Sequence, residues 1–361
     1  HDRIIMNEQA NKDRLDLVSF SLINLNDPFF DSLKDDYKGF SDWFNRKAEK
    51  SETAFILMDE EGNIQAFLYT KIEEGIVEDV SPILPSAKRL KVGTFKVDAH
   101  NTKLGERFIK RITDVAITER VEEIYLTIFP KHEALIKMLK KYGFIQKGQK
   151  GDELVLVKSL VDTTGDLLKD YPLIPIRGNK KYSLAIYPKF HTRMFPDSIL
   201  HNERKERYEL IKDVSHTNSI HKIYVSYMIG LDNLKPGDLL AIYRTSDGKG
   251  NAEYRSVVTS ICRVEEVKTR NDFSSVEEYI GYANAYSIFD EKDLAKLFNR
   301  QNLVIIKMTY NAALTTRVIR KKLIEKVGIS RDAYAGFIEL TDNQFEEILK
   351  LGDVDKHIIV N

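Results

Sequence analysis

Residues His100–Phe108, which read HNTKLGERF, have the types and the position to bind an anion. They lie between an extended apolar run and a run with helical periodicity. Backbone N–H groups at the start of a helix carry partial positive charge, and a glycine in the turn lets an anion approach them. Gly105 supplies the glycine, and Lys103 and Arg107 add positive charge. The stretch predicts a phosphate site; the alternative is an ordinary turn in which Gly105 serves packing.

The elements around this turn alternate between strand and helix, judged by the spacing of apolar residues. Asp27-Pro28 and Ser41-Asp42 supply helix start signals, and Gly143 stops a later helix. The predicted elements are a strand at 15–25, helices at 27–37 and 40–51, a hairpin at 53–75, a strand at 90–98, a helix at 102–121, a strand at 122–129, a helix at 132–144 and a strand at 153–160.

The run from about 15 to 160 resembles the GNAT acetyltransferase superfamily. In that family a strand enters a turn of the type R-G-x-G-x-G/A and then a helix, and a later helix ends in Gly-Phe. Here His100–Gly105 occupies the turn, with Lys103 in place of the first glycine, and Tyr142–Phe144 ends the later helix. The resemblance implies a mixed α+β fold, with a central mixed β-sheet flanked by helices, and a turn that binds the pyrophosphate of acetyl-CoA.

The resemblance also assigns the cofactor residues. It implies that backbone N–H groups near Phe95–Val97 hold the thioester carbonyl, and that this strand separates from the strand at 122–129 to admit the pantetheine arm. The residues assigned to acetyl-CoA are Phe95, Lys96, Val97, His100, Asn101, Thr102, Lys103, Leu104, Gly105, Glu106, Arg107 and His132.

Acetyl transfer to an amine needs a base for the amine and an acid for the leaving thiolate. The family's usual tyrosine falls on Leu139 here, so Tyr142 is the candidate acid, with a packed aromatic as the alternative. The acidic run IEEGIVEDV offers Glu78 as the candidate base, because it lies between the hairpin and the cofactor strand. The alternative for this run is a solvated charged loop.

The bulk composition limits the classes of protein. The chain has 361 residues, which is enough for two domains. Lys+Arg and Asp+Glu both number 55, so any contact with nucleic acid must come from local patches. The one cysteine, Cys262, excludes a disulfide framework and fits a reducing cytoplasm. No apolar run approaches membrane-spanning length, so we expect a cytoplasmic protein without membrane contact.

A second domain follows a predicted linker at 161–180, where Gly and Pro interrupt the pattern. Short strands separated by turn signals predict a small barrel or sandwich. The predicted strands are at 182–188, 220–228, 238–245, 252–267 and 303–310, and the predicted helices are near 274–283, 291–298, 317–328 and 343–352.

This second part covers 181–361 with its C-terminal helices, and its run from about 181 to 310 resembles the PUA-like group of small β-barrels, particularly ASCH-type domains. The matching residues are Ile186, Pro188, Phe190, Gly237, Asp238, Tyr243, Val264 and Val267. The resemblance implies RNA binding, and aromatic and cationic side chains are suited to it. Half-buried sheet residues and a solvated helix face are the alternatives. The candidate nucleic-acid-binding residues are Lys189, His191, Arg193, His216, Arg244, Arg255, Arg317 and Arg320. His216 and His221 lack a third ligand, so no metal site is predicted.

These features predict an acetyl-CoA-dependent N-acetyltransferase with an appended RNA-binding-type domain. Its acceptor is a tRNA, an aminoacyl-tRNA or a ribosome-associated protein, and a toxin-like action on charged tRNA is a sub-hypothesis. One alternative is a nucleic-acid-binding regulator with a catalytically degenerate GNAT-like domain, favoured by Leu139 and the altered turn. The other is an ordinary small-amine or protein acetyltransferase. The acceptor and the oligomeric state stay open.

Overall fold

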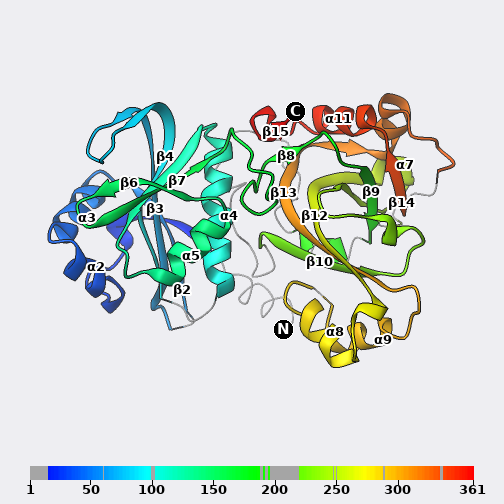
Figure 1. Cartoon of the computed structure of the whole chain (residues 1–361), viewed down its shortest axis with the longest axis horizontal. Coiled ribbons are helices and arrows are strands. Elements are labelled where there is room, and N and C mark those ends of the chain that lie inside the picture. The colour runs from blue at the N-terminus through cyan, green and yellow to red at the C-terminus, as the bar shows by residue number, and fades with distance from the viewer. Residues whose placement is uncertain are drawn as a thin grey trace. The chain divides into compact units, whose positions relative to one another are not determined.

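The computed structural model describes residues 15–59, 61–98, 102–187, 190, 191, 194, 195, 219–246, 248, 250–287, 289–333 and 336–361, without the side chains of Thr102 and Lys103. The chain divides into two compact units between Thr164 and Gly165 (Figure 1). Within the described ranges, none of the helices combines the length and the apolar character that a membrane span requires.

The first unit mixes short helices with strands. Its elements are β1 (Asp16–Ser19), η1 (Phe20–Leu22), η2 (Pro28–Phe30), α2 (Asp31–Asp36), α3 (Phe40–Glu49), β2 (Thr53–Met58), β3 (Ile64–Val77), β4 (Leu84–Val97), α4 (Thr102–Thr118), β5 (Glu123–Ile128), α5 (Glu133–Lys141), β6 (Ile145–Lys150) and β7 (Glu153–Ser159). The predicted sequence of strands and helices is confirmed, except that β6 was missed.

The strands form one mixed sheet in the order β1-β2-β3-β4-β5-β7-β6. The β4–β5 pair is parallel, and the other described pairs are antiparallel. Figure 1 shows α2 and α3 on the opposite side of the sheet from α4. The central mixed sheet with helices on both faces, as predicted, is confirmed.

An aromatic cluster fills the face of the sheet under α2 and α3. Phe20, Phe30, Phe44 and Phe67 are buried there and meet one another edge to face at 4.9–5.7 Å between ring centroids. Such pairs contribute about 0.5–1.5 kcal/mol beyond the burial itself. The cluster fixes the position of η2 and α2 against β2 and β3.

The second unit is built mainly of strands. Its elements are β8 (Ile174–Pro175), β9 (Lys181–Ile186), β10 (His221–Ser226), η4 (Leu231–Asn233), β11 (Leu239–Arg244), α7 (Ala252–Arg255), β12 (Val257–Thr269), η5 (Arg270–Asp272), α8 (Val276–Ala283), α9 (Glu291–Leu297), β13 (Val304–Ile319), α10 (Arg320–Lys322), η6 (Leu323–Val327), β14 (Phe337–Leu340), α11 (Asp342–Leu351), η7 (Lys356–Ile358) and β15 (Ile359–Val360).

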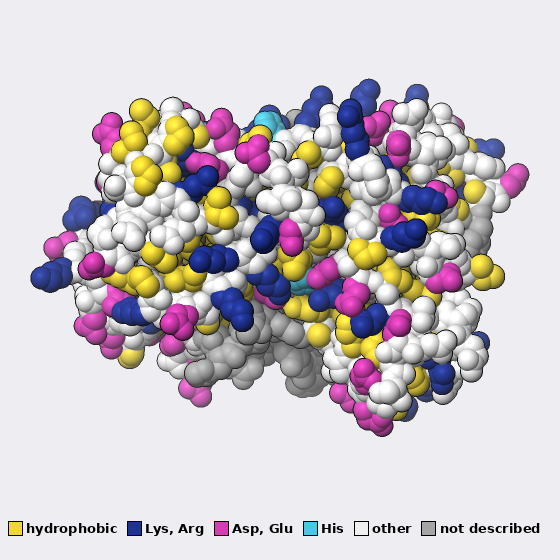
Figure 2. Space-filling view, viewed as in Figure 1, with side chains coloured by type: hydrophobic (Ala, Val, Ile, Leu, Met, Phe, Trp, Pro, Cys, Tyr) yellow, Lys and Arg dark blue, Asp and Glu magenta, His cyan; other side chains and the backbone are white. Residues whose placement is uncertain are grey.

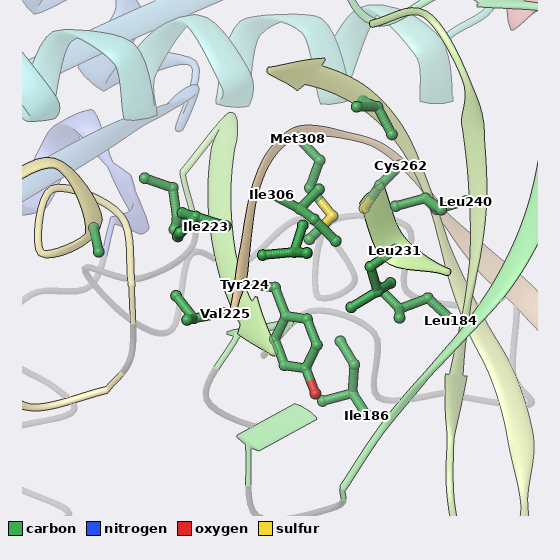
Figure 3. Close-up of a cluster of buried hydrophobic side chains, with 14 of the residues drawn as sticks. Leu184, Ile186, Ile223, Tyr224, Val225, Leu231, Leu240, Cys262, Ile306 and Met308 are labelled. Carbon is green, nitrogen blue, oxygen red and sulfur yellow. The ribbon is translucent and has the colours of Figure 1, made fainter. Parts of the chain in front are cut away.

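Its main sheet runs β10-β13-β12-β11-β9-β14, with β10 and β14 at the two ends of the described pairing. The β9–β11 pair is parallel, so this sheet is also mixed. Register shifts interrupt the long β12–β13 pair, and both strands curve (Figure 1). Side chains from β9 to β13 converge in a buried cluster (Figure 3), among them Leu184, Tyr224, Leu240, Cys262 and Met308.

From Gly165 onward, the segment predicted as a linker is instead part of the second unit. Tyr171 is buried and donates a hydrogen bond to the carbonyl of Tyr310, 3.0 Å away. Asn311 Nδ2 donates to the carbonyls of Pro172 and Leu173, each at 3.1 Å. The run YPLIPI carries enough apolar surface to pack on the sheet, and its prolines hide the strand pattern. The structure therefore corrects the linker at 161–180.

The predicted basic helix at 317–328 is only partly right. Residues up to Ile319 belong to β13, where Val318 pairs with Val258 of β12. Helix α10 then covers Arg320–Lys322 and continues into the π-helical turn η6, which ends at Gly328 with φ 83°. β-Branched residues around Thr316 favour a strand, and pairing with β12 decides the outcome.

Candidate functional site

Strands β4 and β5 separate partway along their length. They pair only from Arg89–Val92 with Glu123–Leu126. Beyond that point β4 stays on β3 as far as Val97, and β5 stays on β7 as far as Ile128. A gap therefore opens between the two strands, and the predicted separation of the cofactor strand from β5 is confirmed.

A bulge in β4 marks the start of this gap. Tyr69 and Thr70 are consecutive in β3, yet they pair with Thr94 and Val92, so Gly93 is the extra residue. Gly93 is exposed, and a Cβ added to it would lie 2.8 Å from Tyr69 Cδ1. Bulges re-aim a strand and are common beside active sites. The sequence analysis missed Gly93, although a glycine inside a strand pattern is a signal for a bulge.

Beyond the bulge, alternate backbone groups of β4 point into the gap. The N–H of Asp98 donates to the carbonyl of Gln65 on β3, at 2.8 Å. Because successive residues of an antiparallel pair direct their N–H groups to opposite sides, Lys96 also points to β3. The N–H groups of Phe95 and Val97 therefore point away from β3, toward the gap. Phe95 and Val97, two of the predicted cofactor residues, thus offer two backbone N–H donors that point in the same direction.

Helix α2 spans the gap on one face of the sheet. At its start, Lys96 Nζ of β4 donates to the carbonyl of Phe29 and lies 4.5 Å from the ring centroid of Phe29. At its end, the Tyr37 ring lies 5.4 Å from that of Phe129, which follows β5. The Tyr37 hydroxyl also donates to Glu153 Oε2 of β7 at 2.8 Å. Burial, followed by this hydrogen bond, raises the pKa of Tyr37.

Helix α4 covers the other face. The Phe108 ring of α4 lies 5.2 Å from that of Phe95. A Cβ on Gly105 would lie 2.3 Å from Met138 Cε of α5, so the missing side chain makes room for Met138. Packing, the alternative that the sequence left open, thus accounts for the glycine itself. Leu104 is buried beside it.

The remaining predicted cofactor residues are only partly described. His100 and Asn101 lie outside the described residues, as do the side chains of Thr102 and Lys103. Glu106 and Arg107 are buried in α4, and Glu106 Oε1 lies 3.9 Å from Lys141 Nζ. The phosphate turn therefore stays a prediction, and the described part of the site is the β4–β5 gap.

Tyr142, the candidate acid, is fully buried at the end of α5. Its carbonyl accepts a hydrogen bond from Lys158 Nζ, 2.6 Å away, and Leu139 is buried one turn before it. This is the position of a packed aromatic. His132 begins α5, where its carbonyl accepts the N–H of Ile136, and partial desolvation lowers the pKa of its imidazole.

Glu78, the candidate base, lies at the wrong end of the hairpin. It is exposed just after Val77, which pairs with Leu84 at the start of β4. Tyr69, beside the bulge, lies nine residues earlier, which corresponds to about 30 Å of extended strand. Glu78 was predicted to adjoin the cofactor strand because it lies between the hairpin and that strand in sequence. In the structure, the register of the long β3–β4 hairpin places Glu78 far from the gap.

A closer titratable pair is Glu73 and Tyr125. Tyr125 of β5 pairs with Lys91 of β4, one residue before the gap opens. Its hydroxyl donates to Glu73 Oε2, and Lys91 Nζ lies 3.8 Å from Glu73 Oε1. Burial, followed by the hydrogen bond to Glu73, raises the pKa of Tyr125. Glu73 was among the acidic residues of the predicted run, whereas nothing in the sequence marked Tyr125.

Solved structures of N-acetyltransferases are similar to part of this chain. Naa20 from Chaetomium thermophilum, in complex with a bisubstrate analogue, is 15% identical over 40% of this chain and 84% of its own, with a TM-score of 0.29. The PaiA N-acetyltransferase from Thermoplasma acidophilum, in complex with coenzyme A, is 10% identical over 40% and 98%, with a TM-score of 0.28.

The solved structure of ASCH from Zymomonas mobilis is also similar to part of this chain. It is 10% identical over 48% of this chain and 95% of its own, with a TM-score of 0.32. No family model and no curated protein matches the chain. At these identities and TM-scores, the fold is assigned from the strand pairing described above.

In the second unit, His191 is a buried residue rather than an exposed nucleic-acid contact. It is 2% exposed, and its Nε2 lies 2.5 Å from Thr259 Oγ1. Burial, with a smaller effect from the Arg244 guanidinium, lowers the pKa of His191 to about 3. His191 is therefore neutral at physiological pH and cannot neutralise a phosphate.

The other described cations lie at one end of the sheet. Arg244 pairs with Val257, which in turn pairs with Ile319, so Arg244 lies near Arg255 and Arg320 in register. Arg255 and Arg317 are exposed. The structure thus brings four predicted residues to the same end of β11, β12 and β13. Lys189, Arg193 and His216 lie outside the described residues.

Proposed function

We propose that this chain is an acetyl-CoA-dependent N-acetyltransferase whose first unit carries the reaction. The observation that supports this most directly is the gap at the Gly93 bulge, into which the N–H groups of Phe95 and Val97 point. Fixed backbone donors of this kind stabilise the negative charge that develops on a thioester carbonyl oxygen during acyl transfer. The donors are fixed because the other side of β4 is held by β3.

Acetyl-CoA would supply the activated acyl carbon as a thioester. The N–H groups of Phe95 and Val97 would donate to the oxygen of this thioester carbonyl. The N-terminus of α4 favours a phosphate through its partial positive charge. On the α2 face, we assign the proton of the acceptor ammonium to Glu73, whose position Tyr125 fixes by hydrogen bonding. The amine loses this proton before it attacks. The nitrogen releases a second proton to solvent as the amide forms, and solvent protonates the leaving thiolate.

For the second unit, we propose that it selects an acceptor carried by RNA. The support is the group of cations at one end of its sheet, because phosphate contacts dominate affinity for nucleic acid. The regulator alternative also has support, since Tyr142 is packed and Leu139 stands at the family's usual acid. Release of free thiol from acetyl-CoA in the presence of pooled aminoacyl-tRNA distinguishes the two, because a regulator binds acetyl-CoA without consuming it.

Val97→Pro is expected to raise the dissociation constant of acetyl-CoA about tenfold, as measured by calorimetry. Proline removes the N–H that points to the gap, and loss of one partner of a desolvated hydrogen bond costs about 1.4 kcal/mol. The ladder to β3 does not use this N–H, so proline is tolerated there as at a sheet edge. Val97→Ala is the matched control, because it keeps the N–H and removes most of the side chain.

The two variants separate the backbone from the side chain. Affinity that falls in Val97→Pro and stays within twofold of the unmodified chain in Val97→Ala supports the assignment. Equal affinities of the two variants would contradict it, and so would an unmodified chain that binds no acetyl-CoA. Near-equal urea midpoints for the two variants verify that the sheet is intact.

A further inference from the structure

One corner of the second unit concentrates cations around an exposed aromatic ring. We name it the α7–α10 patch because it is formed by α7, the end of β13, α10, η6 and the turn after it. Its members are Tyr254, Arg255, Arg317, Arg320, Lys321, Lys322, Lys326 and Arg331. Figure 2 shows Lys, Arg, Asp and Glu side chains spread over one face of the molecule. In the patch segments, seven cations stand against only three acids, Glu253, Glu325 and Asp332.

Backbone and side-chain contacts hold the parts of the patch together. The N–H of Arg320 donates to the carbonyl of Ser256 at 2.9 Å, which fixes α10 against the end of α7. Arg331 Nε lies 2.8 Å from Glu253 Oε1, and Arg320 Nη2 donates to the carbonyl of Arg331 at 3.1 Å. Segments about 65 residues apart in sequence therefore form one surface.

Tyr254 is the aromatic centre of this surface. Its side chain is 50% exposed, which is unusual for a large ring. Lys321 Nζ donates to its hydroxyl at 3.0 Å and lies 5.2 Å from the ring centroid. With these two distances, the ammonium stands beyond the hydroxyl end of the ring rather than over its centre. The ring face stays available for stacking, with a cation beside it.

Several cations of the patch are not used by the fold. Within the described ranges, no ion pair joins an acid to Arg317, Lys322 or Lys326, and all three are exposed. Clustered like charges of this kind repel one another and favour a polyanionic partner. A flexible polyanion whose monomers also stack on aromatic rings satisfies both features of the patch at once.

We propose that the α7–α10 patch binds single-stranded RNA, with one base stacked on Tyr254 and the adjoining phosphates held by the surrounding cations. The proposal rests on the proposed function, in which the acceptor is carried by RNA, and it names the surface that holds that RNA. Stacking on an exposed ring requires an unpaired base, which excludes the interior of a duplex. An acidic protein would use the cations and leave the ring without a role.

Tyr254→Ala is expected to weaken the binding of a fluorescent single-stranded RNA of about 12 nucleotides roughly tenfold, because stacking on one aromatic ring is worth ~1–3 kcal/mol. The measurement is fluorescence anisotropy on the full chain at low salt. The matched control is Tyr227→Ala, since Tyr227 is 44% exposed and Arg300 lies 4.6 Å from its ring centroid. Among the described residues, Arg300 is the cation recorded against the Tyr227 ring, whereas the Tyr254 ring belongs to the group of seven.

The cations are tested through the salt dependence. The double variant Lys322→Ala with Lys326→Ala should lower the slope of log affinity against log salt by about 1.4, at about 0.7 per phosphate contact on a single strand. Its control is Lys235→Ala with Lys292→Ala, which removes two exposed lysines from other elements. These controls should bind RNA as the unmodified chain does.

The outcomes distinguish this surface from the acetyl-CoA site. Equal losses in the Tyr254 and Tyr227 variants overturn the proposal, and so does polyglutamate or an anionic vesicle that competes as well as RNA does. Affinity for acetyl-CoA should be the same in Tyr254→Ala and the unmodified chain. RNA binding that depends on Tyr254 in a chain that binds no acetyl-CoA supports the patch and overturns the acyltransferase proposal alone.

Discussion

Gly93→Ala is expected to destabilise the first unit by about 2 kcal/mol and to weaken acetyl-CoA binding more than tenfold. The added Cβ would lie 2.8 Å from Tyr69 Cδ1 and 3.2 Å from Cε1, well inside van der Waals contact. Overpacking of this kind typically costs about 1–3 kcal/mol. The strain falls on the residue that starts the gap, so binding and stability should change together.

The Tyr69 ring has little freedom to move away. It is 5% exposed and meets the rings of Phe20 and Trp43 edge to face, at 5.5 and 5.4 Å. Its hydroxyl donates to Glu52 Oε1 at 2.8 Å. Because the ring is held from several sides, the backbone at Gly93 must shift instead. A shift there moves the N–H groups of the following residues, which are the proposed donors to the acyl group.

Trp43 makes this prediction measurable on the first unit alone. It is the one tryptophan of the chain, and it packs against Tyr69. Urea unfolding followed by its fluorescence therefore reports the first unit. The matched control is Gly39→Ala, because a Cβ at Gly39 meets nothing within 4 Å. A Gly93→Ala midpoint equal to that of Gly39→Ala would show that the bulge does not need glycine.

The elements of the first unit could be predicted because their periodic runs are long. The helix that begins at Thr102 and the strand around Leu126 show clear spacing of apolar residues, and pairing in the sheet agrees with it. Strand β6 could not be found, since IQKGQK is a polar edge strand with no alternation. Pairing with β7 makes it a strand, and Gln149 also bridges to Ser81. Contacts of this kind cannot be read from a local sequence pattern.

The site was harder to predict because it depends on register. The family resemblance pointed to Phe95 and Val97, and the β3–β4 ladder gives the direction of their N–H groups. Glu78 was misplaced because a hairpin of fourteen-residue strands separates its tip from the gap. The pairing of Glu73 with Tyr125 crosses 52 positions of sequence. Such a pair cannot be found from the spacing of residues within a single helix or strand.

In the second unit too, the candidate surface depends on strand pairing that the sequence does not reveal. Arg255, Arg317 and Arg320 were predicted as separate cations, and the pairing of β12 with β13 brings them to one end of the sheet. Lys321 gained significance only when this pairing placed α7 beside α10, where its ammonium meets the Tyr254 hydroxyl. The chain as a whole has a formal net charge of zero. A local positive surface is compatible with this value, because acidic residues elsewhere balance its charge.

His191 is expected to make the second unit less stable as the pH falls from about 6.5 toward 3. Burial and Arg244 lower its pKa in the folded unit to about 3, from an ordinary value of 6.5. Between these two values the unfolded chain binds a proton that the folded unit does not bind. The free energy of unfolding therefore falls with falling pH, by about 1.4 kcal/mol per unit once the unfolded imidazole is fully protonated.

The one cysteine reports this effect on the second unit alone. Cys262 is fully buried in the core, and burial raises the pKa of its thiol, so a disulfide reagent reacts with it only when the unit opens. Labelling in urea with a dipyridyl disulfide, which works in acid, gives the free energy of unfolding at each pH. His191→Gln is the matched variant, because its amide can still reach Thr259 Oγ1 and does not titrate. From about pH 6 to 5 the unmodified chain should lose about 1 kcal/mol more than the variant does, and parallel losses in the two would mean that the buried imidazole already takes up a proton in the folded unit.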